Sequence, residues 1–360
     1  MRKKIVIFAA CLLTAAFIIS SGRGVKLSFA SPSLTVLAGG KTYVFCGDEL
    51  ENSIFGLRLK DIDEVLSGIA ADCFLPCEDA VVTFKPNNDN KFSYKKEKLG
   101  RKIDEEQLKT DVLTALSVGG GQVEANTITL YPAFTVEKAK KESFLRGSFT
   151  TEFPLSTAER KKNIKLSASS LIGKTLQPGE TLSFNKAVGE RTEERGYKTA
   201  KVIIDGKMTD GLGGGVCQTS STLYNAALRA GLKIAERHPH SVAPVYVDKS
   251  FDATVSYGFQ DLKIVNDTSG RIYIGGFVTN KEVTFEIYGL ENEYEYFFES
   301  VTQEEIVEKD ELSGENFITG YVTEGIVTVK KNGKIVKKYR LSKDKYTLST
   351  PIMRASGEND

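Results

Sequence analysis

The chain has 360 residues, of which 41% are hydrophobic and 26% are charged, and this balance excludes both a disordered chain and a polytopic membrane protein. Its length suggests about two or three domains. The formal net charge is +1, but positions 1–30 hold five basic residues and no acidic one, so the remainder carries 1 − 5 = −4. A mildly acidic remainder argues against a nucleic-acid partner.

An export signal is predicted at the start of the chain. Three basic residues precede the apolar run 5–19, and a basic start followed by an apolar run is typical of secretory signals. Ser28-Phe29-Ala30 resembles a cleavage site, whereas the run extended to Gly22 approaches the length of a membrane span. We therefore expect residues 1–30 to form a signal peptide or a membrane anchor, and the rest of the chain to be exported.

Residues 31–150 are predicted to form a small α+β domain. Alternating apolar residues around Gly39-Gly40 predict a β-hairpin at 31–45, and apolar residues at helical spacing predict two helices. The predicted helices cover 57–69 and 103–117, and further strands are predicted at 80–84, 91–94 and 127–131. For the three cysteines of this region, a Cys73–Cys77 disulfide, a Cys46–Cys73 disulfide and a zinc site are the alternatives.

Residues 151–295 are predicted to form a second domain of mixed helix and mainly antiparallel sheet. Ser156 and Glu159 match a capping box for a helix that ends at Gly173. Another helix is predicted at 218–230, and strands are predicted from there to about residue 290, including one at 255–257. Residues 296–360 are predicted to be a β-rich extension, in which Asn332-Gly333 marks a hairpin turn.

A lone cysteine follows three glycines just before the second helix of this domain. Cys217 stands 140 positions beyond Cys77, and a lone cysteine in an exported chain is a candidate reactive thiol. Gly213-Gly214-Gly215 let the backbone approach a ligand closely. A helix N-terminus stabilises a thiolate and can hold the oxyanion that forms when the thiolate attacks a carbonyl. We interpret Cys217 as a nucleophile, and the alternative is a cysteine that packs under a glycine turn.

The chain has only two histidines, and both follow the cysteine-bearing helix. Two prolines within residues 234–247 exclude a regular helix, so alternate residues share a face, and Glu236, His238 and His240 point the same way. Either histidine is a candidate for the base that takes the proton of the thiol and returns it to the leaving amine. Two surface histidines and a Cys-His-His zinc site are the alternatives.

A third group is expected to orient the base. Asp252 and Asp261 follow the histidines closely, and we take Asp252 as the candidate, with a turn-capping role as its alternative. No cofactor is predicted. Three arginines are candidates to hold a substrate carboxylate: Arg191, Arg195 and Arg237. Four polar residues spaced by four line one stripe of the helix, which faces either a polar pocket or water: Cys217, Ser221, Asn225 and Arg229.

Three stretches of sequence carry a family resemblance. They are PGETLSFNKAVGERTEERGYKTAKVIIDGK, GGGVCQTSSTLYNAALRAGLKIAERHPHS and DATVSYGFQDLKIVND. Together they resemble the VanW domain of bacterial envelope proteins, from about Ala158 to Val278. Residues 80–132 resemble, more weakly, a peptidoglycan-binding domain that often precedes VanW domains, and residues 310–346 resemble a truncated β-rich domain of wall proteins. One departure is that Ser250-Phe251 stands where relatives often have Gly-Arg.

The resemblance implies an activity, because some VanW-domain proteins act as peptidoglycan L,D-transpeptidases whose motif cysteine is the nucleophile. It implies Cys217 as nucleophile and His240 or His238 as base. The expected product is a 3-3 peptide cross-link made through a thioester, with peptidoglycan stem peptides and glycan as partners. The expected location is the cell wall or the outer face of the cytoplasmic membrane. The expected substrate-binding residues are Gly214, Gly215, Gln218, Ser220, Arg237 and Ser241. The alternatives are a non-catalytic wall-binding protein and a cysteine peptidoglycan hydrolase.

Overall fold

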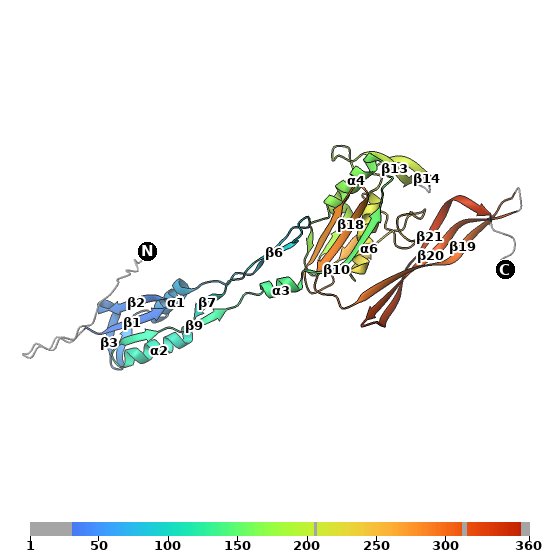
Figure 1. Cartoon of the computed structure of the whole chain (residues 1–360). Coiled ribbons are helices and arrows are strands. Elements are labelled where there is room, and N and C mark those ends of the chain that lie inside the picture. Colours follow the sequence, from blue (N-terminus) through green and yellow to red (C-terminus); the bar gives the residue numbers. More distant parts are fainter. Residues whose placement is uncertain (1–30, 205–206, 312–314, 354–360) are drawn as a thin grey trace, which may run out of the picture. The chain divides into compact units, whose positions relative to one another are not determined.

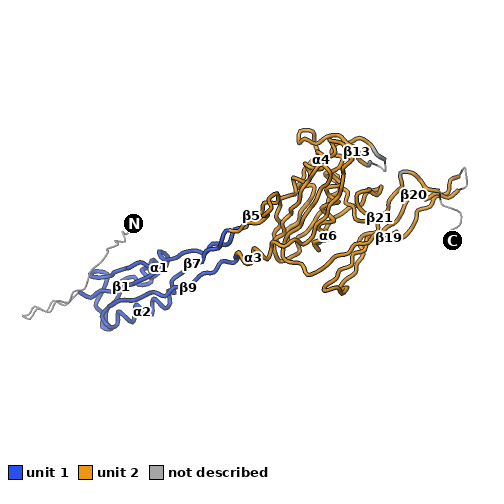
Figure 2. The backbone as a smooth tube through the Cα atoms, in the orientation of Figure 1, with its two compact units in different colours: residues 1–81, 95–135 blue, residues 82–94, 136–360 orange. Residues whose placement is uncertain are grey.

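The computed structural model of the chain describes residues 31–204, 207–311 and 315–353, so the predicted export signal at 1–30 lies outside the described residues. The described residues form two compact units, one of residues 31–81 and 95–135 and the other of residues 82–94 and 136–353 (Figure 2). Both units combine helices with mainly antiparallel sheets, which confirms the predicted α+β class. No helix within the described ranges is long and apolar enough to cross a membrane.

The first unit is built on the predicted hairpin, β1 (Ser33–Ala38) and β2 (Lys41–Cys46), and β8 (Gly121–Glu124) extends it by pairing parallel to β1. Helices α1 (Ile62–Cys73) and α2 (Glu105–Ser117) share an apolar core with β1 and β8. Helix α1 begins five residues later than predicted, because the preceding residues pair as a strand. The other elements are η1 (Gly47–Glu49), β3 (Leu50–Ser53), β4 (Gly56–Leu59), β7 (Gly100–Ile103) and β9 (Thr127–Leu130).

The cysteines of the first unit are free thiols. Cys46 is exposed, Cys77 is partly buried, and neither forms a disulfide. Cys73 is buried at the end of α1, where its Sγ lies 3.3 Å from the carbonyl oxygen of Ala38 and 3.4 Å from the hydroxyl of Tyr43. The two disulfides considered from sequence are therefore not formed, and Cys73 serves as a small core residue.

The second unit is centred on an antiparallel sheet in the order β10 (Phe144–Glu152), β18 (Glu282–Gly289), β17 (Ile272–Val278) and β11 (Thr175–Leu176). Helices α4 (Ala158–Ser169) and α6 (Val216–Arg229) pack beside each other against this sheet (Figure 1). The hairpin β5 (Val81–Phe84) and β6 (Phe92–Lys95) contributes two aromatic rings, Phe84 and Phe92, which pack against Tyr273 and Tyr288 of the sheet. Helix α3 (Val136–Lys141) precedes β10.

The remaining elements of the second unit lie around the start of α6 and at the end of the chain. A three-stranded sheet holds β12 (Thr181–Ser183), β16 (Lys263–Val265) and β15 (Lys233–Glu236), and β12 leads into α5 (Phe184–Val188). A hairpin is formed by β13 (Thr199–Ile204) and β14 (Lys207–Leu212). The antiparallel strands β19 (Glu295–Lys309), β20 (Asn316–Lys331) and β21 (Lys334–Met353) make what we call the C-terminal sheet.

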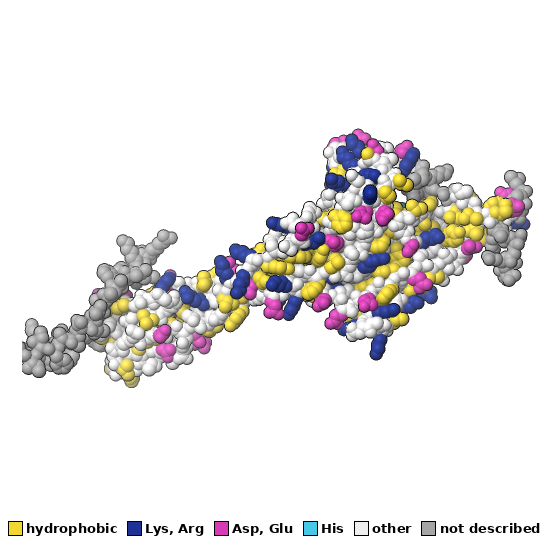
Figure 3. Space-filling model, viewed as in Figure 1, with side chains coloured by type: hydrophobic (Ala, Val, Ile, Leu, Met, Phe, Trp, Pro, Cys, Tyr) yellow, Lys and Arg dark blue, Asp and Glu magenta, His cyan; other side chains and the backbone are white. Residues whose placement is uncertain are grey.

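Two local predictions are corrected by the structure. Thr157, rather than Ser156, caps α4, because Thr157 has the extended backbone of an N-cap and its side chain accepts the amide hydrogen of Arg160 at 3.3 Å. The strand predicted at 255–257 is absent, and this stretch makes only isolated bridges, including Ser256 with Gln260. The predicted turn at Asn332-Gly333 is confirmed, with both residues at positive φ. On the face shown in Figure 3, basic and acidic side chains are interspersed.

Candidate active site

The three glycines form a tight turn that sets the start of α6. Gly213 and Gly215 have φ values of +82° and +106°, which favour glycine. A Cβ on Gly214 would lie 2.6 Å from the carbonyl oxygen of Lys201, so only glycine fits there without movement of the backbone. Asn163 of α4 is fully buried and donates to the carbonyl of Gly214 at 3.0 Å. Gly214 and Gly215, predicted to bind substrate, therefore shape the turn that presents the thiol.

Cys217 is the second residue of α6, which begins two residues earlier than predicted. The thiol is partly buried, and its Sγ lies 3.6 Å from both the hydroxyl of Thr254 and the carbonyl oxygen of Val255. The amides of Val216 and Gln218 donate to the carbonyls of Gly213 and Gly215 at 3.1 and 3.0 Å, and the helix dipole is positive at this end of α6. Cys217 is thus placed where a thiolate is stabilised.

His240 and Asp252 form a buried pair beside the thiol. The side chain of Asp252 is fully buried and that of His240 is 8% exposed. One carboxylate oxygen of Asp252, Oδ2, lies 2.6 Å from Nδ1 of His240 and accepts the amide hydrogen of the same residue at 2.7 Å. Since the carboxylate holds Nδ1, the other nitrogen of the ring is left for the sulfur of Cys217, with which the imidazole interacts electrostatically.

These contacts invert the usual order of the two pKa values. Burial raises the pKa of Cys217, but interactions with His240, Val255 and Thr254 together outweigh burial and lower that pKa to about 7. Burial lowers the pKa of His240, but its interactions with Asp252 and Cys217 raise that pKa to about 9. The pKa of Asp252 stays below its usual value despite burial, because His240 and Arg237 favour its charged form. Between these pH values the pair is a thiolate and an imidazolium.

The second histidine does not join this arrangement. Nε2 of His238 lies 3.0 Å from Oε1 of Glu236, and the His238 side chain is 36% exposed. The carbonyl of His238 accepts the amide hydrogen of Thr254 at 2.8 Å. Of the two candidate bases, the structure therefore brings only His240 to Cys217. The Cys-His-His zinc site is not supported, since no three potential metal ligands converge anywhere in the described part of the chain.

Two of the predicted substrate-binding residues are buried and already paired. Gln218 donates to the hydroxyl of Thr151 and to a β10 carbonyl, both at 3.0 Å, and accepts from Arg160 at 2.8 Å. Ser220 donates to the carbonyl of Ala253 at 2.6 Å. These side chains hold α6 in place, so the prediction that they contact substrate does not fit their positions. The side chain of Ser241 stays exposed, and its carbonyl accepts from the amide of Thr347 at 2.7 Å.

The polar stripe on α6 faces protein rather than water. Ser221 accepts the amide hydrogen of Ala253 at 2.9 Å, and Asn225 donates to the carbonyl of Phe251 at 2.6 Å. Both residues are thus hydrogen-bonded to the backbone on either side of Asp252. The stripe therefore holds α6 against the segment that carries Asp252.

The three candidate arginines have different surroundings. Arg195 donates to two backbone carbonyls, at 2.7 and 2.8 Å. Arg237 is 6% exposed and bridges Asp252 and Asp344, so it is not free to bind a substrate carboxylate as predicted. Both terminal nitrogens of Arg191 are buried, and no group in the described residues accepts a hydrogen bond from them. The stem of Arg191 packs against the glycine turn, where a Cβ on Gly213 would lie 3.1 Å from it.

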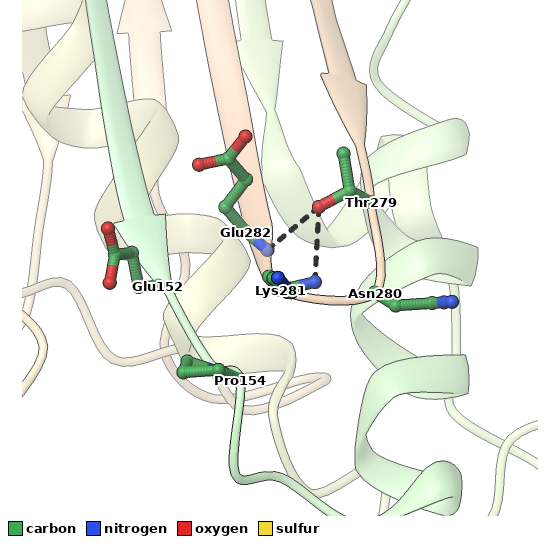
Figure 4. A pocket seen from close by; sticks show the side chains of 6 residues that line it. All are labelled: Glu152, Pro154, Thr279, Asn280, Lys281 and Glu282. Carbon is green, nitrogen blue, oxygen red and sulfur yellow. Dashed lines mark hydrogen bonds between the residues drawn. The ribbon is translucent and has the colours of Figure 1, made fainter.

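A separate depression lies at the turn between β17 and β18. Its lining includes Glu152, Pro154 and residues 279–282, where the hydroxyl of Thr279 accepts two backbone amide hydrogens at 3.1 Å (Figure 4). It contains neither the thiol nor a histidine, so we assign it no chemistry.

The structure thus brings together a cysteine, a histidine and an aspartate, the three residue types that cysteine acyl-transfer sites combine. Residues 159–288 match the family model described as VanW like protein, so this part of the chain is a VanW-like domain, as the sequence predicted.

Two curated proteins are similar to this domain. YoaR, an uncharacterized protein of Bacillus subtilis (strain 168), is 40% identical over 157 residues, which are 43% of this chain and 52% of YoaR. The vancomycin B-type resistance protein VanW of Enterococcus faecalis (strain ATCC 700802 / V583) is 39% identical over 111 residues, which are 29% of this chain and 40% of that protein. The chain thus spans about half the length of these relatives or less, and no solved structure matches it.

Proposed function

We propose that the chain is a cell-envelope cysteine enzyme, a peptidoglycan L,D-transpeptidase that forms 3-3 cross-links. The observation that carries the proposal is the arrangement of His240 and Asp252 beside Cys217, which lies in the first turn of α6. In this arrangement the thiol pKa is about 7 and the imidazole pKa is about 9. The similarity to a vancomycin resistance protein supports a role in the envelope.

In the first step, the Cys217 thiolate attacks the carbonyl carbon of the third residue of a stem peptide. The backbone amide of Cys217 and the positive end of the α6 dipole would stabilise the oxyanion. The carbon–nitrogen bond breaks, His240 gives its proton to the leaving amine, and the terminal D-Ala departs while a thioester forms.

In the second step, the amine of a neighbouring stem attacks the thioester. His240, now neutral, takes the proton of this amine, and the carbon–sulfur bond breaks to release the thiolate. A new amide replaces the old one, so no external energy source is needed. If water replaces the amine, the same site acts as a hydrolase.

The test is the mass of the products formed from a disaccharide-tetrapeptide, with Cys217→Ala as the negative control. The proposal expects a cross-linked dimer and released alanine. Shorter fragments, or monomer that has lost alanine without dimer, would assign a hydrolase instead. A folded protein that binds wall polymer without forming any product would contradict the proposal and favour a wall-binding protein.

The same proposal gives Arg191 a role in substrate recognition. Its two terminal nitrogens are buried without a hydrogen-bond acceptor among the described residues, and the guanidinium carbon lies 5.7 Å from the centre of the Phe184 ring. A buried cation without an acceptor is costly, and the stem of Arg191 packs against the glycine turn that precedes Cys217. The donor stem ends in a carboxylate one residue beyond the bond that breaks, and a guanidinium binds a carboxylate through two parallel hydrogen bonds. We assign Arg191 to this carboxylate.

Arg191→Gln is therefore expected to lower the rate at which iodoacetate alkylates Cys217, relative to iodoacetamide, by about tenfold, the effect of one charge-assisted hydrogen bond. Arg195→Gln removes the same charge four residues away and should change this ratio less than about twofold, because Arg195 already binds two carbonyls. Equal effects of the two variants, or no effect of either, would contradict the assignment. The assay needs no transpeptidation, so it remains valid if the proposed reaction is wrong.

The proposal also places the chain outside the cytoplasmic membrane, with the first unit binding the wall polymer. Removal of residues 31–81 and 95–135, with residues 82–94 of the second unit retained, should then abolish cosedimentation of the protein with purified sacculi. Unchanged cosedimentation would assign wall binding to the second unit.

A further inference from the structure

The hydrogen-bond network of Asp252 continues into a part of the chain that lies beyond the VanW-like domain. The match to the family ends at residue 288, yet the second carboxylate oxygen of Asp252, Oδ1, accepts a hydrogen bond from the hydroxyl of Tyr346 at 2.6 Å. Tyr346 belongs to β21 of the C-terminal sheet. The same Asp252 oxygen accepts from Arg237 at 2.8 Å.

A second carboxylate from the same strand fixes Arg237. The two oxygens of Asp344 accept from Nη1 of Arg237 at 2.7 and 2.6 Å, while Nε of Arg237 donates to the carbonyl of Asp252 at 2.6 Å. Asp344 and Tyr346 are both 1% exposed. Buried polar groups are held in the geometry in which each has a hydrogen-bond partner. The side chains of Asp344 and Tyr346 therefore fix the positions of Arg237 and Asp252.

Residues on one side of the C-terminal sheet make these contacts. Residues two apart on a strand point to the same side, which places Asp344 and Tyr346 together on β21. Thr323 of β20 lies opposite Asp344 in the register. Its hydroxyl lies 2.8 Å from that of Ser250, and the amide of Ser250 donates to the hydroxyl of Tyr346 at 2.8 Å. Two strands of the sheet thus contact the residues just before Asp252.

The departure from the family pattern lies at this contact. Ser250 has a φ of +69°, a backbone conformation that glycine adopts more easily. Phe251 is 3% exposed, and its ring meets that of Phe298 of β19 edge-on, with centroids 5.7 Å apart. A Cβ on Gly325 of β20 would lie 3.2 Å from the same ring. Phe251 is therefore an apolar contact for the C-terminal sheet rather than a group that faces the thiol.

We propose that the C-terminal sheet completes the active site, and that Asp344 and Tyr346 are positioning residues that hold Asp252, and through it His240, in the orientation required by Cys217. The catalytic unit then extends from the VanW-like domain to β21. The inference rests on the proposed cysteine chemistry only in that Cys217 is the group whose reactivity is tuned.

The test is the rate at which iodoacetamide alkylates Cys217 in the full chain, followed on the Cys217 peptide by mass spectrometry from pH 6 to pH 10. In Asp344→Asn, Arg237 loses the carboxylate whose two oxygens accept from its Nη1. The charge of Arg237 is then balanced by Asp252 alone, and Asp252 stabilises the imidazolium of His240 less. We expect the rate at pH 7 to fall about fivefold, because a rise of one unit from a thiol pKa of about 7 lowers the thiolate fraction from about one half to about one tenth. We expect Tyr346→Phe to lower it about threefold, because Asp252 keeps Arg237 as a partner.

The rate in both variants should return to that of the wild type near pH 10, because the thiol is then ionised without help from His240. Tyr339→Phe removes a hydroxyl from the same strand and serves as the matched control, with an unchanged profile expected. Wild-type rates at pH 7 in both variants would overturn the proposal. Rates that stay low at every pH would also overturn it, since they would indicate a merely structural role. If the wild-type protein forms no cross-linked product but the variants show these changes in alkylation rate, only the transpeptidase proposal is contradicted.

Discussion

Replacement of His240 by glutamine is expected to slow acyl transfer by about three orders of magnitude or more, because the site loses both its proton carrier and the cation that stabilises the thiolate. Burial of Cys217 remains in the variant and by itself raises the thiol pKa. The pKa should therefore rise from about 7 to its ordinary value or above. At pH 7 the thiolate fraction should then fall from about half to about 1% or less.

The pH profile of the rate tests this expectation. In the wild type, activity should rise through a pH of about 7, where the thiolate forms, and fall through a pH of about 9, where the imidazolium loses its proton. His240→Gln should lack the falling limb. His238→Gln is the matched control, and it should stay within about twofold of the wild type because His238 pairs with Glu236. Equal losses in the two variants would refute the assignment of His240.

Asp252→Asn is expected to lower turnover by about a thousandfold or more, because an amide does not supply the charge that stabilises the imidazolium and orients the ring. The change also breaks a buried ion pair with Arg237. Loss of one partner of a buried pair typically costs about 3 kcal/mol or more, and urea unfolding should show a decrease of this order in the free energy of unfolding.

Asp261→Asn separates the catalytic effect from the structural one. Asp261 was the second aspartate considered from sequence, and it accepts from Ser183 at 2.5 Å and from the amide of Asn185 at 2.8 Å. Its replacement should destabilise the protein while leaving the alkylation profile of Cys217 unchanged. If Asp252→Asn showed the same pattern, with normal thiol reactivity and reduced stability, its role would be structural.

The reactive series could be predicted from sequence because its signals are local. The glycine turn places Cys217 in the first turn of α6, and the chain has only two histidines to consider. Alternation predicts that Glu236, His238 and His240 share one face, but the structure pairs His238 with Glu236 and His240 with Asp252. The prediction is wrong for His240, because alternation holds for an extended strand and β15 ends at Glu236.

The roles predicted for the substrate-binding residues depended on partners that sequence does not reveal. Gln218 is predicted to bind substrate, but its partners on β10 and α4 lie 58 or more positions earlier in the chain. Tyr346 lies 94 positions from Asp252, and two strands with irregular register separate it from the domain. No periodicity in the sequence could link these residues, because the link depends on how the C-terminal sheet packs against residues 250–252.

The central claim is that Cys217 carries the acyl group. Its most direct test is the intact mass of the protein after brief incubation with disaccharide-tetrapeptide and an acid quench, followed by peptide mapping. The account predicts an adduct equal to the donor minus alanine, located on Cys217 and removed by hydroxylamine as a thioester. Products that accumulate without such an adduct, or an adduct on another residue, would contradict the account.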